Sequence, residues 1–109
     1  MIKKQLGEGS EPIRVYLFGA GKIGQHMVEK LLSEGEKNKW KIEGFLDNSE
    51  EKHLTRIQGI PVYHPNDLIK LENKSNGDFK ILVTMKDSEN GQRQLEELGY
   101  KEYILDKAE

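Results

Sequence analysis

The 109-residue chain contains no cysteine. Disulfide bonds, thiolate metal ligands and a cysteine nucleophile are therefore excluded. No apolar run approaches the roughly 18 residues that a membrane-spanning helix requires, so we expect no membrane span. The lysines near the N-terminus are not followed by an apolar segment of the kind found in signal peptides. Together these absences predict a cytoplasmic protein.

The chain also lacks an excess of charge of either sign. Lys and Arg number 17 and Asp and Glu number 19, which gives a formal net charge of −2. Domains that bind nucleic acid or anionic membranes usually carry a basic excess, so we expect no nucleic-acid partner. Charged residues make up 33% of the sequence and apolar residues 35%, which predicts a densely charged surface around a modest core.

The pattern of apolar residues predicts one domain. Residues 1–12 are polar and are expected to form a flexible leader, and residues 13–109 are expected to form the domain. Segments rich in β-branched and aromatic residues alternate with helical patterns, and a polar loop is expected at 49–58. Such alternation is typical of a parallel sheet, because each crossover returns along a sheet face. Strands are expected at 13–18, 40–46, 60–63, 79–85 and 100–105.

This arrangement is an α/β, Rossmann-like three-layer domain with a parallel five-stranded sheet of order 3-2-1-4-5. A glycine-rich turn joins its first strand to its first helix, with the pattern Gly-x-Gly-x-x-Gly. The pattern is informative here because a buried strand precedes it and an amphipathic helix follows it. The candidate phosphate-binding residues are Gly19, Ala20, Gly21, Lys22, Ile23 and Gly24.

Each glycine of this turn has a physical role. Gly19 can adopt the positive φ of a tight turn. Gly21 has no Cβ, so a diphosphate can approach the backbone, and Gly24 allows the helix to lie close to the first strand. The amides and partial positive charge at the helix N-terminus would then face the anion. The alternative is a tight βα turn that no longer binds a ligand.

Further candidates follow the second and fourth strands. Asp47 ends the second strand at roughly the spacing where such domains carry an acid for the ribose hydroxyls. A carboxylate there would repel a 2′-phosphate, which favours NAD over NADP. Alternatively, Asp47 and Asn48 form only an Asx turn. Thr84, Met85 and Lys86, at the end of the fourth strand, are expected to line the same crevice, although a solvated loop charge is the favoured interpretation of Lys86.

No catalytic set can be identified in the sequence. Tyr103 and Lys107 have the spacing of the catalytic pair of short-chain dehydrogenases, but Tyr103 falls in a predicted strand and we regard the match as coincidental. His26, His53 and His64 have no partner at a metal-ligand spacing, so no metal site is expected. Whether the chain is an enzyme stays open; a binding domain or a fragment is favoured over a complete enzyme.

Four segments together carry a family resemblance: Gly19–Gly24, Gly44–Asn48, Gly59–Tyr63 and Pro65–Leu68. With them the chain resembles the small Rossmann-type nucleotide-binding domains of bacterial surface-polysaccharide biosynthesis. Such domains occur in front of nucleotide-sugar dehydratases and epimerases, in front of sugar acetyltransferases, and attached to sugar methyltransferases.

The resemblance implies NAD or a UDP-sugar as ligand, with phosphate contacts at Gly19–Gly24 and ribose or base contacts at Asp47 and Asn48. Many relatives have a glycine soon after the Asp-Asn pair, where this chain has His53 and Leu54. The shape of that loop is the one departure from the family pattern.

Three functions remain open at this point. The first is a nucleotide-binding module that serves a separate or fused sugar-modifying enzyme and lacks complete catalytic machinery. The second is the cofactor-binding fragment of an NAD-dependent nucleotide-sugar dehydratase or epimerase, or of an oxidoreductase. The third is a structural or dimerisation domain, since the exposed edges of the predicted sheet suit a homodimer.

Overall fold

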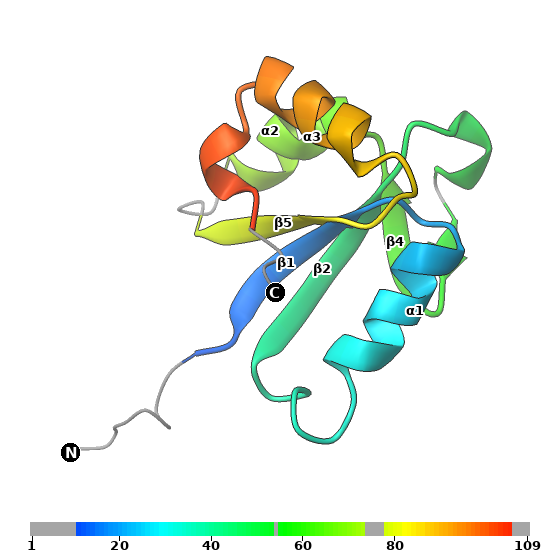
Figure 1. Ribbon diagram of the computed structural model, residues 1–109, viewed down its shortest axis with the longest axis vertical. Helices are drawn as coiled ribbons and strands as arrows, with labels where there is room; N and C mark the ends of the chain where they lie inside the picture. The colour runs from blue at the N-terminus through cyan, green and yellow to red at the C-terminus, as the bar shows by residue number, and fades with distance from the viewer. Residues whose placement is uncertain (1–10, 54, 74–77, 106–109) are drawn as a thin grey trace.

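The computed structural model describes residues 11–53, 55–73 and 78–105. Within them the chain forms a five-stranded mixed sheet of order β3-β4-β2-β1-β5 (Figure 1). The strands are β1 (Ile13–Phe18), β2 (Trp40–Leu46), β3 (Arg56–Ile57), β4 (Ile60–Tyr63) and β5 (Phe79–Val83). The α-helices are α1 (Lys22–Leu31), α2 (Leu68–Glu72) and α3 (Ser88–Glu97), and the 3₁₀ turns are η2 (Glu50–Lys52), η3 (Pro65–Asp67) and η4 (Lys101–Tyr103).

The four longer strands confirm the centre of the predicted sheet. β1 pairs in parallel with β2 on one side and with β5 on the other, and β2 pairs in parallel with β4. A strand that is hydrogen-bonded at both edges and covered on both faces has a nearly continuous apolar sequence. β1 follows this rule, since Val15 to Phe18 are all buried.

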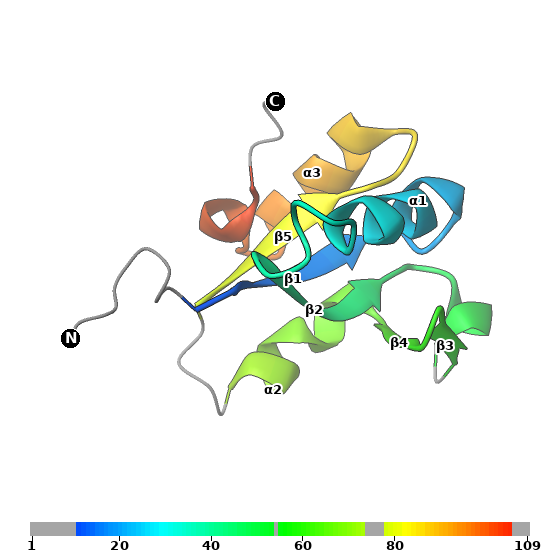
Figure 2. The same cartoon turned by 90° about the horizontal axis from the view of Figure 1, so that it is seen from below.

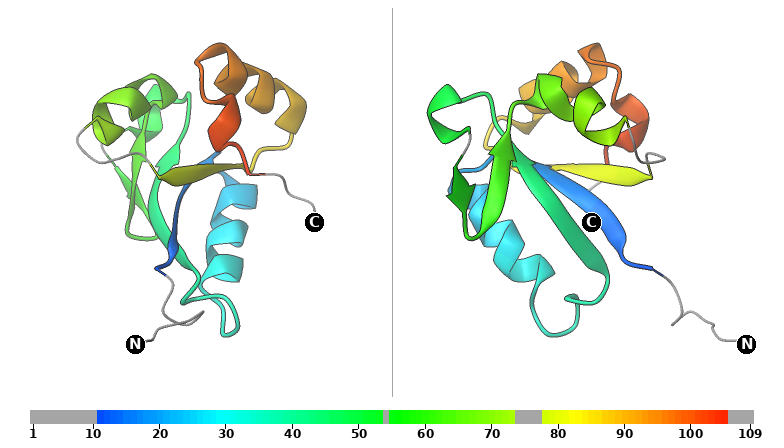
Figure 3. Two further views of the ribbon diagram at one scale, coloured as in Figure 1. Left: turned by 90° about the vertical axis from the view of Figure 1, so that its left-hand side faces the viewer. Right: turned by 180° about the vertical axis from the view of Figure 1, so that it is seen from behind.

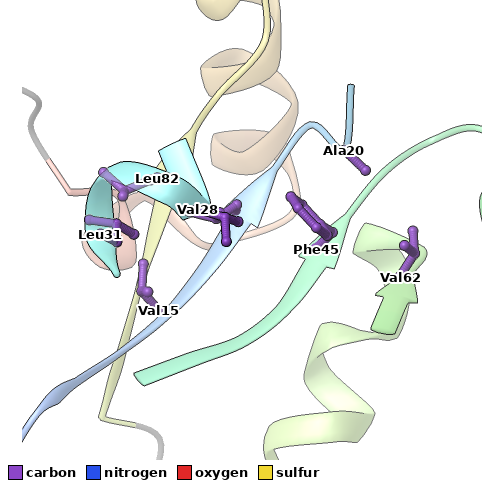
Figure 4. Close-up of a cluster of buried hydrophobic side chains, with 8 residues drawn as sticks. Val15, Ala20, Val28, Leu31, Phe45, Val62 and Leu82 are labelled. Carbon is purple, nitrogen blue, oxygen red and sulfur yellow. The ribbon is translucent and has the colours of Figure 1, made fainter. Parts of the chain in front are cut away.

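Alternate side chains of β1 supply two separate cores. Val15 and Leu17 belong to the core beneath α1, whereas Tyr16 and Phe18 belong to the core beneath α2 and α3. The helices therefore cover opposite faces of the sheet, α1 on one face and α2 with α3 on the other (Figure 3). Figure 2 shows β3 and β4 side by side at one edge of the sheet. Figure 4 shows the first core, in which α1 packs on the central strands.

The prediction of an all-parallel sheet of order 3-2-1-4-5 is wrong at the edges, because the sheet is mixed and has the order β3-β4-β2-β1-β5. Residues 56–57, expected in a loop, form β3, which pairs antiparallel with β4. Gln58 and Gly59 between them have positive φ values of +56° and +79°. This is the backbone of a two-residue type I′ hairpin turn. A strand of two residues gives too short a pattern to be found by periodicity.

The predicted fifth strand at 100–105 is also wrong. Residues 101–103 form η4, and only one parallel bridge, between Ile81 and Ile104, continues the sheet. Tyr103 instead lays its ring on Phe79, with centroids 4.3 Å apart and planes 11° from parallel. The aromatic residue that suggested a strand is therefore packed against the sheet, and residues 101–103 do not add a strand to it.

A buried ionic network fastens α2 to the amino-terminal half of the sheet. The Arg14 guanidinium contacts Glu43 at 2.9 Å and Glu72 at 2.6 Å, and the Tyr16 hydroxyl donates to the same Glu72 oxygen at 2.5 Å. Burial and this hydrogen bond raise the pKa of Tyr16, and the bond to Glu72 raises the pKa of Arg14. Both groups therefore keep one protonation state at neutral pH.

We predict that Arg14→Met lowers the free energy of unfolding by about 2 kcal/mol, because it removes the guanidinium while the Glu72 carboxylate stays buried. Arg14 is partly exposed, so the loss is smaller than for a fully buried pair. Urea unfolding followed by circular dichroism measures the change. Lys39→Met, which breaks the exposed pair with Glu36, is the control and should change stability by less than about 0.5 kcal/mol. Equal effects of the two substitutions would contradict this account.

Candidate functional site

An open cleft of about 430 Å³ lies where the carboxyl ends of β1, β2 and β5 meet. The turns that follow these three strands lie at one end of the sheet in Figure 1. Nine of the eleven residues predicted at this crevice line the cleft; Ala20 and Gly24 do not. The lining consists of Phe18, Gly19, Gly21, Lys22, Ile23, Asp47, Asn48, Thr84, Met85 and Lys86.

Two glycines are required by the packing of the turn itself. Gly19 has φ +122°, and a Cβ there would meet the Thr84 carbonyl. A Cβ on Gly24 would overlap the Gly19 carbonyl oxygen and press on the Phe45 ring. These positions let α1 approach β1 closely, as predicted for the first and third glycines.

Gly21 differs from the other two because a Cβ there would meet nothing within 4 Å. It is the N-cap of α1, has no side-chain cap, and no acidic residue occupies the first helical turn. The first amides of a helix lack partners within the helix and carry partial positive charge. The side-chain space at Gly21 is therefore free on the side of the cleft, next to these amides.

Asp47 is held by the backbone on both sides. Its Oδ2 accepts from the Ala20 amide at 2.8 Å and its Oδ1 accepts from the Ser49 amide at 2.8 Å. The Lys52 ammonium lies 3.6 Å from Oδ2. The Asx turn that was one alternative for Asp47 is present, and the same carboxylate also braces the glycine-rich turn.

Thr84 is buried, and its hydroxyl lies 3.1 Å from the Phe18 carbonyl oxygen and 3.0 Å from that of Gly19. Its amide also donates to Phe18. Thr84 therefore ties the end of β5 to the glycine turn. Its contact with a ligand stays a prediction, and its observed bonds assign it a bracing role.

Sequence reasoning missed three residues around the cleft. The side-chain amide of Asn48 exchanges two hydrogen bonds with that of Gln94 in α3, at 3.0 and 2.9 Å. The His53 ring lies 2.6 Å from the Asp47 carbonyl oxygen through Nε2. Lys52 is the third. No sequence signal connects Gln94 to Asn48, because only the tertiary packing of α3 brings them together.

Other predicted features have these outcomes. His64 caps η3, with its Nδ1 accepting from the Asn66 amide at 3.0 Å. Tyr103 is in η4 rather than a strand, and Lys107 lies outside the described residues, as do Leu54 and most of the leader. Across the described ranges, no three His, Asp or Glu side chains gather as metal ligands would. In the same ranges, no helix has the length and apolarity to cross a membrane.

Comparison with known proteins gives the family. Residues 12–105 match the model described as C2185-like, N-terminal. The chain belongs to this family. Among curated proteins, this C2185-like chain is similar to the redox-sensing transcriptional repressor Rex of Bacillus cereus (strain B4264), with 39% identity over 70 residues. That match covers 64% of the chain but 31% of the repressor, so the chain spans about a third of the length of these curated relatives.

Solved structures share the fold of the C2185-like chain. UDP-D-quinovosamine 4-dehydrogenase from Vibrio fischeri matches with a TM-score of 0.67 and 24% identity, over 85% of this chain and 74% of that one. RSP, a Rex-family repressor, matches with a TM-score of 0.62 and 18% identity, over 82% of this chain and 42% of that one. The fold is therefore Rossmann-like, as predicted.

The expectation of no nucleic-acid partner is contradicted. The curated relatives are transcriptional repressors, and RSP has been crystallised with β-NAD⁺ and operator DNA. The expectation relied on the net charge of the whole sequence. That charge is a sum over all residues and does not locate an interface. It also contains no information about the parts of a relative that this chain does not match.

We predict that Gly24→Ala lowers the free energy of unfolding by about 2 kcal/mol or more, because the added methyl group forces α1 away from β1. Gly35→Ala is the matched control, since a Cβ at Gly35 meets nothing within 4 Å. Urea unfolding of both variants measures the difference. Unchanged stability of Gly24→Ala would show that the helix does not need this close approach.

Proposed function

We propose that the chain is a nucleotide-binding domain that holds the diphosphate of NAD or NADH at the N-terminus of α1. The observation that carries the proposal is the contrast among the three glycines. Gly19 and Gly24 are glycines because protein atoms fill the space of a side chain. Gly21 is not explained by packing, and its empty side-chain space opens on the cleft.

The charges of the cleft support an anionic ligand. Lys22 and Lys86 are among the lining residues, and within the described part of the chain Asp47 is the only acid that joins them there. Two ammonium groups and the α1 N-terminus together favour a diphosphate, which carries negative charge on both phosphates. These cations are exposed, so they attract the ligand over a distance and the backbone amides supply the directional contacts.

The relatives favour a dinucleotide. The curated relatives are described as redox-sensing, and RSP has been crystallised with β-NADH. By analogy, the adenosine ribose of NADH would lie near Asp47 and Ala20. Among the described residues that line the cleft there is no paired acid and base, so we propose binding without complete catalytic machinery.

A UDP-sugar is the second candidate ligand. The Vibrio fischeri structure is that of a UDP-sugar dehydrogenase, and the four motif segments resemble domains of polysaccharide biosynthesis. A UDP-sugar would place its diphosphate on the same amides, so the two ligands differ at the base and at the far end. A role beside a sugar-modifying enzyme in polysaccharide biosynthesis is part of this second proposal, as is the dehydratase or epimerase fragment.

Isothermal titration of the full chain with NADH, NAD⁺ and UDP-N-acetylglucosamine tests the proposal. We expect NADH to bind, and Gly21→Val to weaken binding by about 100-fold, or about 2.7 kcal/mol, because its methyl groups occupy the phosphate position. Gly35→Val is the control: its side chain also enters open space, but at the other end of α1, and it should leave binding unchanged.

Three results are informative. Binding of the UDP-sugar alone, abolished by Gly21→Val, moves the assignment to the second candidate. Equal affinity of Gly21→Val and the wild-type chain refutes the phosphate site. No response to any nucleotide, with both variants folded by circular dichroism, leaves the domain with a structural role.

A further inference from the structure

We propose that Lys52 makes the ribose end of the cleft accept a 2′-phosphate, so that the domain binds NADPH about as well as NADH. The inference deepens the proposed function and rests on it. It reverses the sequence-based expectation that the Asp47 carboxylate excludes NADP. The reason is the local environment of that carboxylate, which the sequence does not reveal.

Half of the acceptor positions of Asp47 are used by backbone amides. A carboxylate offers about four acceptor positions. The Ala20 and Ser49 amides use two of them, each at 2.8 Å, and the Lys52 ammonium lies 3.6 Å from Oδ2. Asp47 therefore keeps two acceptor positions for a ribose, and the Lys52 ammonium lies beside Oδ2, the oxygen that carries one of them. It acts mainly as the brace between the end of β2 and the glycine turn.

The same three donors offset the negative charge of Asp47. Repulsion of a 2′-phosphate depends on a carboxylate whose field is not compensated. Here an ammonium and two amide dipoles point at it, and Lys22 and Lys86 line the cleft nearby. Lys52 therefore balances the charge of Asp47, and the two lining cations Lys22 and Lys86 face no second acid among the described residues of the lining.

Lys52 is held in place by its neighbours. Its amide donates to Ser49, and the next residue, His53, places its ring on the Asp47 carbonyl oxygen. Both contacts fix η2 against the end of β2. Within η2, Glu50 and Glu51 are exposed whereas Lys52 is only partly so. The turn therefore directs its cation toward Asp47 and exposes its two acids to water, which screens their charge.

The ammonium has the freedom that a phosphate contact requires. The Lys52 side chain retains 37% of its exposure, against 14% for Asp47. A lysine reaches an anion as a mobile point charge on a flexible stem. It can contact a phosphate monoester, which carries close to two negative charges at pH 7, without leaving the vicinity of Asp47.

Titration of NADH and NADPH into the full chain, followed by dinucleotide fluorescence, tests the inference. For the wild-type chain we expect dissociation constants within about tenfold of each other. Lys52→Gln should weaken the binding of NADPH by about tenfold or more and that of NADH by less than about threefold. Lys52→Arg should retain NADPH binding. Lys39→Gln is the matched control, because it also breaks an exposed ion pair, with Glu36, outside the cleft.

Salt provides a second measurement that needs no variant. Raising the ionic strength should lower the affinity for NADPH more steeply than that for NADH, because the additional contact of NADPH, between its 2′-phosphate and Lys52, is between charges. A wild-type preference for NADH above about tenfold overturns the inference, and so does an equal loss of both ligands in Lys52→Gln. In either case the proposed function survives. If neither dinucleotide binds to the folded chain, both the proposed function and this inference are refuted.

Discussion

The close approach of α1 to β1 is the constraint on which the rest of the site depends. It requires that the space beside Gly24 be filled by the Gly19 carbonyl and the Phe45 ring rather than by a side chain. Once the helix is seated there, its first amides are directed into the cleft and Gly21 lies at the edge of the helix. Packing in the core thus fixes the position of the α1 N-terminus, where the proposed diphosphate would bind.

The turn is braced before any ligand arrives. Asp47 holds it from the β2 side through the Ala20 amide, and Thr84 holds it from the β5 side through the carbonyls of Phe18 and Gly19. Preorganisation of this kind reduces the ordering cost of binding. It also changes how Asp47 is interpreted. An acid already engaged by two backbone amides contributes more to the shape of the turn than to recognition of a ribose.

The sequence predicted the parts of the structure that depend on short-range patterns. The strands at 13–18, 40–46 and 60–63 and the core of the fourth strand show in their apolar runs, and the glycine spacing marks the cleft. The parts it could not predict depend on tertiary choices. Within the strand-like run at 100–105, residues 101–103 form η4, and the Tyr103 ring stacks on Phe79, a contact between residues far apart in sequence that no local pattern predicts. The Gln58–Gly59 turn supports a strand too short to leave a pattern.

The prediction that excluded a nucleic-acid partner failed for a related reason, and the same reasoning bears on the role of Asp47. Residue counting treats Asp47 as a free carboxylate and the domain as uniformly charged. In the structure the same acid is surrounded by two amides and an ammonium, while the Arg14 network collects opposite charges at the other end of β1. The effect of a charged group depends on its partners and on its burial rather than on the total. A domain with net charge −2 can therefore present a cationic cleft, and neither its ligand nor its partner follows from its composition.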